Sequence, residues 1–181
     1  MKFASQIVLG LSLAFAAPAF AATAATAPAA QLAASEPAHL KAVQDLLGAM
    51  QIEKVLKGVA ARSRYASESQ KQDVLAKLDK VPPAEIYRRL APALTRAISA
   101  DTALEMSRFY NSAYGKQVIY KKYNSGAQLV MPGMTKAVAP EEKKERKRAA
   151  YVQASKALDE AEPVIEHEAF KLMQLINKEK R

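Results

Sequence analysis

The chain of 181 residues has no cysteine, no tryptophan, six glycines and two histidines. Without cysteine it has no disulfide, no thiol nucleophile and no cysteine that could carry a lipid. The histidines, His39 and His167, do not form a metal-binding pattern. Glu166-His167-Glu168 differs from His-Glu-x-x-His, which places two ligands on one face of a helix. The sequence therefore predicts no metal, no cofactor and no catalytic residue.

An apolar run long enough to span a bilayer is also missing. Met1-Lys2 is followed by a short apolar run at Ile7–Phe15, a break at Pro18 and the small-x-small sequence Ala19-Phe20-Ala21. This order is typical of a secretory signal peptide, and the run is too short for a membrane anchor. We predict that residues 1–21 are removed, and that the mature protein is periplasmic or secreted from a bacterium, with no transmembrane segment.

Basic residues outnumber acidic ones by 27 to 18, which gives a formal net charge of +9. Loss of Lys2 with the signal peptide leaves 26 basic residues and a charge of +8. Outside the cytoplasm, the anions that such a protein meets are lipid headgroups, envelope polysaccharides and acidic proteins, not nucleic acid. We therefore expect an envelope protein or an anionic envelope component as partner. The alternative is that the charge only keeps the protein soluble.

Apolar residues recur at steps of three and four along most of the mature chain, and period-two alternation is missing. We predict an all-α fold: a compact bundle of about five or six helices with a long C-terminal helix. That helical region opens at Pro140-Glu141-Glu142, and its stripe at Tyr151–Ile176 keeps its phase across Pro163, which predicts a kinked but continuous helix. The predicted parts are a signal peptide at 1–21, a disordered leader at 22–36, a helical domain at 37–138 and a C-terminal helical extension at 139–181.

Local signals place several helix boundaries. Pro37 suits the first turn of a helix, and a phase shift in the apolar stripe predicts a corner at Gly48–Gln51. Ser67 and Gln70 have the spacing of a capping box. A later helix is expected to end around Pro132-Gly133.

The most distinctive segment is Phe109-Tyr110-Asn111-Ser112-Ala113-Tyr114-Gly115-Lys116. We interpret it as a junction between two helices, in which Phe109 and Tyr110 anchor the end of the first helix and Ser112 caps the second. Gly115 has no Cβ, so another helix could approach closely there. Ser112 lacks the Gly-x-Ser-x-Gly elbow of a hydrolase nucleophile, which favours a structural role.

This segment resembles the signature of a secreted bacterial protein family of unknown function, a Phe-Tyr-x-Ser-Pro-x-Gly-Lys/Gln run within a small helical domain. Ala113 replaces the proline that the family usually has. Leu46–Leu56 resembles the family's opening helices and Met131–Met134 its Met-Pro-x-Met ending, so the resemblance covers roughly residues 38–138. It implies a secreted helical fold with no established activity. The residues that match the signature are Phe109, Tyr110, Ser112, Gly115 and Lys116.

Basic residues also gather near tyrosines. Lysines within Tyr110–Tyr123 could form a platform for anions or glycans, the alternative being core packing with the tyrosine hydroxyls at the surface. The run Lys143–Arg148 could dock on an anionic membrane, the alternative being a solvated helix face on which Glu142 and Arg146 pair. The candidate anion- or partner-binding surface comprises Tyr114, Lys121, Lys122, Lys143, Lys144, Arg146, Lys147 and Arg148.

These observations favour a non-enzymatic protein that binds another macromolecule of the cell envelope. A first alternative is a basic holding chaperone with a groove lined by methionine and tyrosine and a positive rim. A second alternative is an enzyme that acts on cell-wall or lipid material.

Overall fold

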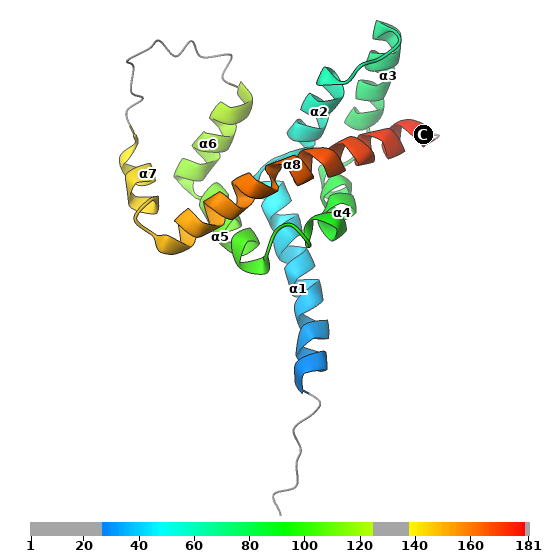
Figure 1. The fold of residues 1–181 in the computed structure, drawn as a ribbon. Coiled ribbons are helices and arrows are strands. Elements are labelled where there is room, and N and C mark those ends of the chain that lie inside the picture. Colours follow the sequence, from blue (N-terminus) through cyan, green and yellow to red (C-terminus); the bar gives the residue numbers. More distant parts are fainter. Residues whose placement is uncertain (1–26, 125–137, 180–181) are drawn as a thin grey trace, which may run out of the picture.

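The computed structural model describes residues 27–124 and 138–179. These residues are all-helical, as predicted, and they form eight α-helices and no strand. The number exceeds the predicted five or six, in part because the C-terminal region forms two helices. The helices are α1 (Ala27–Ala49), α2 (Ile52–Arg62), α3 (Glu68–Asp79), α4 (Pro83–Leu94), α5 (Ala100–Asn111), α6 (Ala113–Asn124), α7 (Pro140–Glu145) and α8 (Ala149–Lys178) (Figure 1).

Helix α1 lies at the centre of the fold. It packs against α4 and α5. Helix α8 crosses over α4 and α5, and it also contacts α2 and α3. Figure 1 shows α2 and α3 near one end of α8, and α6 and α7 near its other end. Burial of apolar side chains between these helices is the main stabilising term. The fully buried side chains include Val43, Leu46, Leu47, Ile52, Leu56, Leu94 and Ile176.

Helix α8 is part of this core, so the C-terminal extension packs on the helical domain. The apolar residues along one face of α8, which are spaced by three and four positions, are buried against the helical domain. The helix continues through Pro163, as predicted. Pro163 is exposed, so the carbonyl left without its helical partner can be hydrated. The buried residues of α8 are Ala154, Leu158, Ala161, Ile165, Ala169, Leu172, Met173 and Ile176.

Helix α1 begins at Ala27, well before the start predicted at Pro37. Residues 27–36 are therefore helical, although their composition predicted a disordered leader. Alanine is the strongest helix former, and this segment contains many alanines. Pro37 is exposed within the helix. Residues 22–26 of the predicted leader lie outside the described residues.

The corner between α1 and α2 falls at Met50 and Gln51, within the predicted range. Gln51 has φ 53° and ψ 53°, a left-handed conformation that costs a residue with a side chain roughly 1–2 kcal/mol. The Tyr123 hydroxyl of α6 donates a hydrogen bond to the Met50 carbonyl at 2.9 Å. The Lys54 ammonium lies 5.2 Å from the centroid of the same tyrosine ring. Helix α6 therefore supports the corner.

The C-terminal helical region opens at Pro140, as predicted, and it is divided into two helices between Glu145 and Ala149. Arg148 has an extended backbone, with φ −88° and ψ 115°. Its guanidinium lies 2.7 Å from Glu105 on α5, an ion pair that favours the turn over a continued helix. Helix α6 is described as far as Asn124, and the predicted end at Pro132-Gly133 lies outside the described residues.

No helix within residues 27–124 and 138–179 combines the length and apolar character needed to cross a bilayer.

Candidate functional site

The junction motif joins α5 to α6 through the cap that the sequence predicted. Ser112 has the extended backbone of an N-cap, with φ −66° and ψ 159°. Its Oγ accepts a hydrogen bond from the Gly115 N–H at 3.0 Å and donates one to the Phe109 carbonyl at 2.6 Å. The hydroxyl therefore satisfies a free donor of α6 and gives the Phe109 carbonyl, which also accepts from the Ser112 N–H, a second hydrogen bond.

We expect Ser112→Ala to lower the free energy of unfolding by about 1 kcal/mol, because α6 loses its cap and the Phe109 carbonyl loses one of its two hydrogen bonds. Ser69→Ala is the matched control: Ser69 is exposed in α3, and its substitution should stay within about 0.5 kcal/mol of the wild type. Urea melts of the two variants measure the difference. Equal midpoints would contradict the capping role.

Gly115 lies in the first turn of α6 and is buried. An added Cβ would lie 1.9 Å from the Phe109 carbonyl oxygen and 2.7 Å from the Tyr110 Cα. The close helix approach that the sequence predicted is thus present, and its partner is the last turn of the preceding helix. No side chain fits at this position without movement of the backbone.

The Phe109 ring is the centre of an aromatic cluster that joins three helices. It is buried, and its centroid lies 5.2 Å from Tyr110, 6.1 Å from Tyr114 on α6 and 4.8 Å from Tyr151 on α8. The Tyr114 hydroxyl donates to Glu142 of α7 at 2.9 Å. The contacts of Tyr110 and Tyr114 match the alternative in which the tyrosines pack in the core with their hydroxyls at the surface. Tyr120, in contrast, is exposed.

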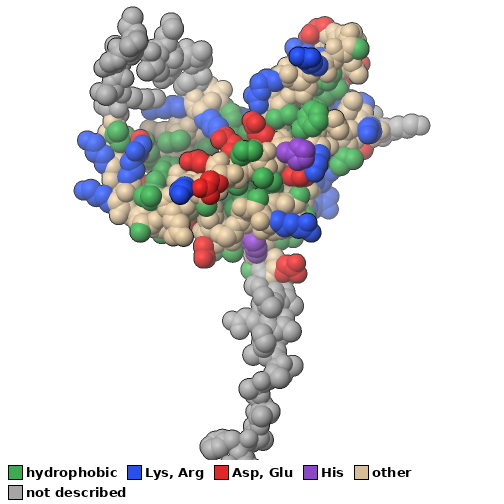
Figure 2. All heavy atoms as spheres, in the orientation of Figure 1, with side chains coloured by type: hydrophobic (Ala, Val, Ile, Leu, Met, Phe, Trp, Pro, Cys, Tyr) green, Lys and Arg blue, Asp and Glu red, His purple; other side chains and the backbone are tan. Residues whose placement is uncertain are grey.

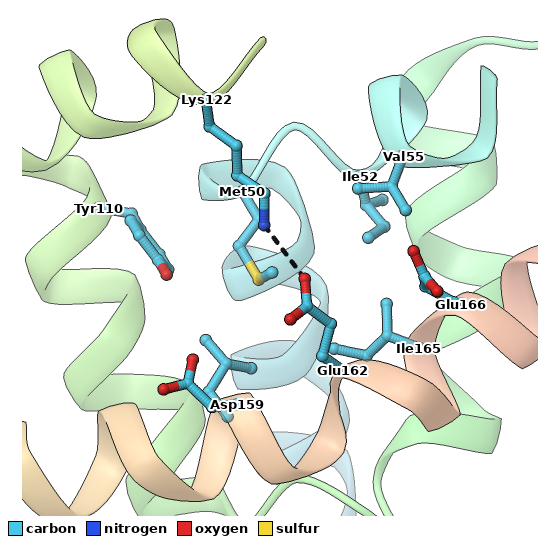
Figure 3. Close-up of a pocket in the computed structure, with 10 residues that line it drawn as sticks. Met50, Ile52, Val55, Tyr110, Lys122, Asp159, Glu162, Ile165 and Glu166 are labelled. Carbon is cyan, nitrogen blue, oxygen red and sulfur yellow. Dashed lines mark hydrogen bonds and ion pairs between the residues drawn. The ribbon is translucent and has the colours of Figure 1, made fainter. Parts of the chain in front are cut away.

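Beside the junction, a small cleft of about 50 Å³ lies between α6, α8 and the α1–α2 corner (Figure 3). Its apolar residues come from the α1–α2 corner, α2 and α8, and its polar groups are the Tyr110 hydroxyl, the Lys122 ammonium and three carboxylates of α8. Lys122 Nζ lies 3.4 Å from Glu162 Oε1. The lining residues are Met50, Ile52, Val55, Tyr110, Lys122, Leu158, Asp159, Glu162, Ile165 and Glu166.

The rim of this cleft is acidic. Burial raises the pKa of Tyr110 to about 12, and Tyr151 and the Asp159 carboxylate add smaller contributions in the same direction. The Tyr110 hydroxyl therefore stays protonated at neutral pH. Lys122 is the only cation among the lining residues, and Glu162 pairs with it. The positive rim expected for a holding chaperone is not found at this cleft.

A second, shallow hollow of about 420 Å³ lies between α2 and α8, and Val59, Pro163 and Phe170 line it. The Arg62–Glu166 ion pair joins the two helices there at 3.3 Å. His167 also lines this hollow, whereas His39 Nε2 lies 2.7 Å from the Ile98 carbonyl. Among the described residues, no three side chains of the metal-ligating types are grouped as a metal site would need.

Two of the acidic side chains of α7 contact neighbouring groups of the fold. Glu142 accepts hydrogen bonds from Tyr114 and from Arg146, whose Nη2 lies 2.5 Å from its Oε1. Glu145 accepts from Arg108 of α5 at 2.6 Å and from Arg148 at 2.8 Å. Glu142 and Glu145 are therefore partnered by neighbouring groups of the fold, whereas the third glutamate of α7, Glu141, is exposed and forms no ion pair with another described residue.

A network of four charged side chains fixes α7 and the start of α8 to α5. Arg108 and Arg148 each contact both Glu105 and Glu145, at 2.6–2.8 Å. The side chains of Glu105 and Glu145 are 15% and 17% exposed, so water screens these pairs less than it screens typical surface pairs. The network holds a helix that itself has no buried residue.

The lysines of the same segment face solvent. Lys143, Lys144 and Lys147 are exposed, and none of them forms an ion pair with another described residue. Figure 2 shows blue side chains gathered over α7, at the end of the molecule opposite α3. We call these three residues the lysine face.

The residues of the binding surface predicted from the sequence have different surroundings in the structure. Arg146 and Arg148 are paired with carboxylates, Tyr114 is half-buried against α7, and Lys122 belongs to the cleft. Lys121 is exposed on α6, as is Lys116 of the motif. The three lysines of the lysine face remain together.

Sequence reasoning missed the residues that arrange this surface. Glu105 and Arg108 lie on α5, far from α7 in sequence, and no local pattern pairs them with it. The acidic side of the cleft could be predicted from the sequence, because Asp159, Glu162 and Glu166 are spaced by three and four residues on one helix face.

Comparison of the chain with protein-family models, with curated proteins and with solved structures gives no match. The resemblance of the junction motif to a secreted family stays a prediction. The case for a function therefore rests on the contacts and charges of the chain itself.

Proposed function

We propose that this chain is a non-enzymatic helical protein of the bacterial cell envelope, and that its lysine face binds an anionic macromolecule or an anionic surface of that envelope. The observation that carries the proposal is that most carboxylates of α7 are paired within the fold, whereas the lysines of α7 and of the turn after it are not. Glu142 and Glu145 are partnered within the fold, whereas Lys143, Lys144 and Lys147 are exposed without an ion pair among the described residues.

This arrangement gives the end of the molecule a positive potential. Glu142 and Glu145 are largely neutralised by Arg146, Arg108 and Arg148, so of the three glutamates of α7 only Glu141 offsets the charge of the three lysines. Unpaired charges of one sign on one surface attract a partner of the opposite sign and increase its rate of association. The predicted signal peptide at residues 1–21 supports a partner outside the cytoplasm.

The holding-chaperone alternative has less support. A chaperone needs a broad apolar surface for unfolded clients. The cleft that contains Met50 and Tyr110 has a volume of about 50 Å³ and an acidic rim. It is small for that task, and its charge is opposite to that of the expected groove.

Fractionation of the envelope tests the proposal. The mature protein, residues 22–181, is mixed with isolated membranes and with peptidoglycan sacculi, and the bound fraction is measured after sedimentation. We expect at least one anionic fraction to retain the protein at low salt. The triple variant Lys143→Gln, Lys144→Gln, Lys147→Gln should lose most of this binding.

A matched control removes the same charge elsewhere. Lys80, Arg88 and Arg96 are exposed around α4, without an ion pair among the described residues, and their triple glutamine variant should bind as the wild type does. Circular dichroism confirms that both variants are folded. If the two variants lose binding equally, net charge alone is responsible and the lysine face has no special role.

A further inference from the structure

We infer that the partner of the lysine face is an anionic phospholipid surface, which α7 contacts reversibly through lipid headgroups. This inference rests on the proposed function and names the partner. Three features of the described residues favour a lipid surface over a polysaccharide or an acidic protein. They are the type of cation exposed, the position of α7 and the strength of attraction that three lysines provide.

The first feature is that the arginines of this region form ion pairs within the fold, whereas its lysines do not. Arg108, Arg146 and Arg148 are paired with carboxylates of the fold, which leaves lysines as the only cations of residues 140–148 without an ion pair to another described residue. Arginine presents a planar fork that recognises a carboxylate or phosphate in a fixed geometry, whereas lysine is a flexible, hydrated point charge. Unpaired lysines therefore suit a fluid array of headgroups, in which no single anion holds a fixed position.

The second feature is the position of α7. This helix has no buried residue and lies at the outer edge of the molecule, as Figure 1 shows. Neither of the two hollows described above is lined by Lys143, Lys144 or Lys147. A polymer strand or a peptide is usually held in a groove, while an outward-facing set of lysines can meet an extended surface.

The third feature is the expected strength. A basic residue near an anionic leaflet raises the partition coefficient roughly fivefold, so three lysines together contribute about 100-fold. Such attraction produces weak and reversible binding. Because the Debye length falls from about 8 Å at physiological salt to about 3 Å at 1 M, binding should disappear at high salt.

Vesicle sedimentation tests the inference with defined partners. The mature protein is mixed with vesicles of about 30 mol % phosphatidylglycerol in phosphatidylcholine, with vesicles of phosphatidylcholine alone, and with the soluble polyanion dextran sulfate. We expect binding to the phosphatidylglycerol vesicles only, with loss of that binding at about 1 M salt. The triple variant of Lys143, Lys144 and Lys147 should bind about 100-fold more weakly, and the triple variant of Lys80, Arg88 and Arg96 should bind as the wild type does.

The other outcomes overturn the inference in distinguishable ways. Binding to dextran sulfate but not to vesicles would refute the lipid partner and leave the proposed function in place. Vesicle binding that is equal in both triple variants, or that persists at about 1 M salt, would assign the contact to another surface or to an apolar insertion. If vesicles, polymer and envelope fractions all fail to bind, the proposed function fails as well.

Discussion

Replacing Gly115 by alanine is expected to lower the free energy of unfolding by about 3 kcal/mol or more. The added Cβ would lie 1.9 Å from the Phe109 carbonyl oxygen, which is far inside contact distance. Because the obstacle is backbone of α5, no rotation of a side chain can relieve the clash. The junction between α5 and α6 would have to open, and the Ser112 cap would be lost with it.

Gly58→Ala provides a matched control. Gly58 lies within α2, and the nearest atom to an added Cβ is the end of the flexible Arg62 side chain, at 3.3 Å. Alanine at this position should be neutral or stabilise the protein by up to about 1 kcal/mol, since glycine is a poor helix former. Thermal melts should separate the two variants by roughly 10 °C for a chain of this length. A melting temperature of Gly115→Ala close to the wild type would contradict the described junction.

Phe109→Ala is expected to cost about 3–5 kcal/mol, the range observed when a buried aromatic ring is removed. Phe109 is 3% exposed and contacts aromatic rings of α6 and α8 in addition to its own neighbour on α5. Its removal leaves a cavity at the point where the three helices meet. The remaining side chains cannot fill that volume without shifting whole helices.

Phe170→Ala is the comparison for this substitution. The Phe170 side chain is 37% exposed in the hollow between α2 and α8, so its removal should change stability by no more than about 1 kcal/mol. Denaturant midpoints of the two variants measure the difference. If both cost the same, the aromatic cluster does not hold the junction together.

The sequence predicted the features of this fold that depend on near neighbours in the chain. The N-cap at Ser112 and the capping box at Ser67 follow from side chains that reach a backbone N–H three residues later. The buried stripe of α8 was visible because helical spacing brings apolar residues onto one face. Local chemistry fixes these features whatever surrounds them.

Features that depend on distant parts of the chain could not be predicted in the same way. The sequence grouped Lys143–Arg148 as one basic surface, and only the approach of α5 shows that Arg148 is used inside the fold. The close contact between Gly115 and the Phe109 carbonyl depends on the angle between α5 and α6, and this angle cannot be predicted from the local sequence. Helix α1 extends before Pro37 because alanine's helix propensity outweighs the disorder that the composition of this segment predicts.

The claim that the lysine face contacts a lipid surface is tested most directly by local labels. Because the chain has no cysteine, a single introduced cysteine can carry a fluorophore at one known position. Ala149→Cys places it beside Lys147, and Ser69→Cys places it on α3 at the opposite end of the molecule. With vesicles that contain phosphatidylglycerol and a lipid-borne quencher, the label at position 149 should be quenched and the label at position 69 should not. Equal quenching, or stronger quenching at position 69, would contradict the account.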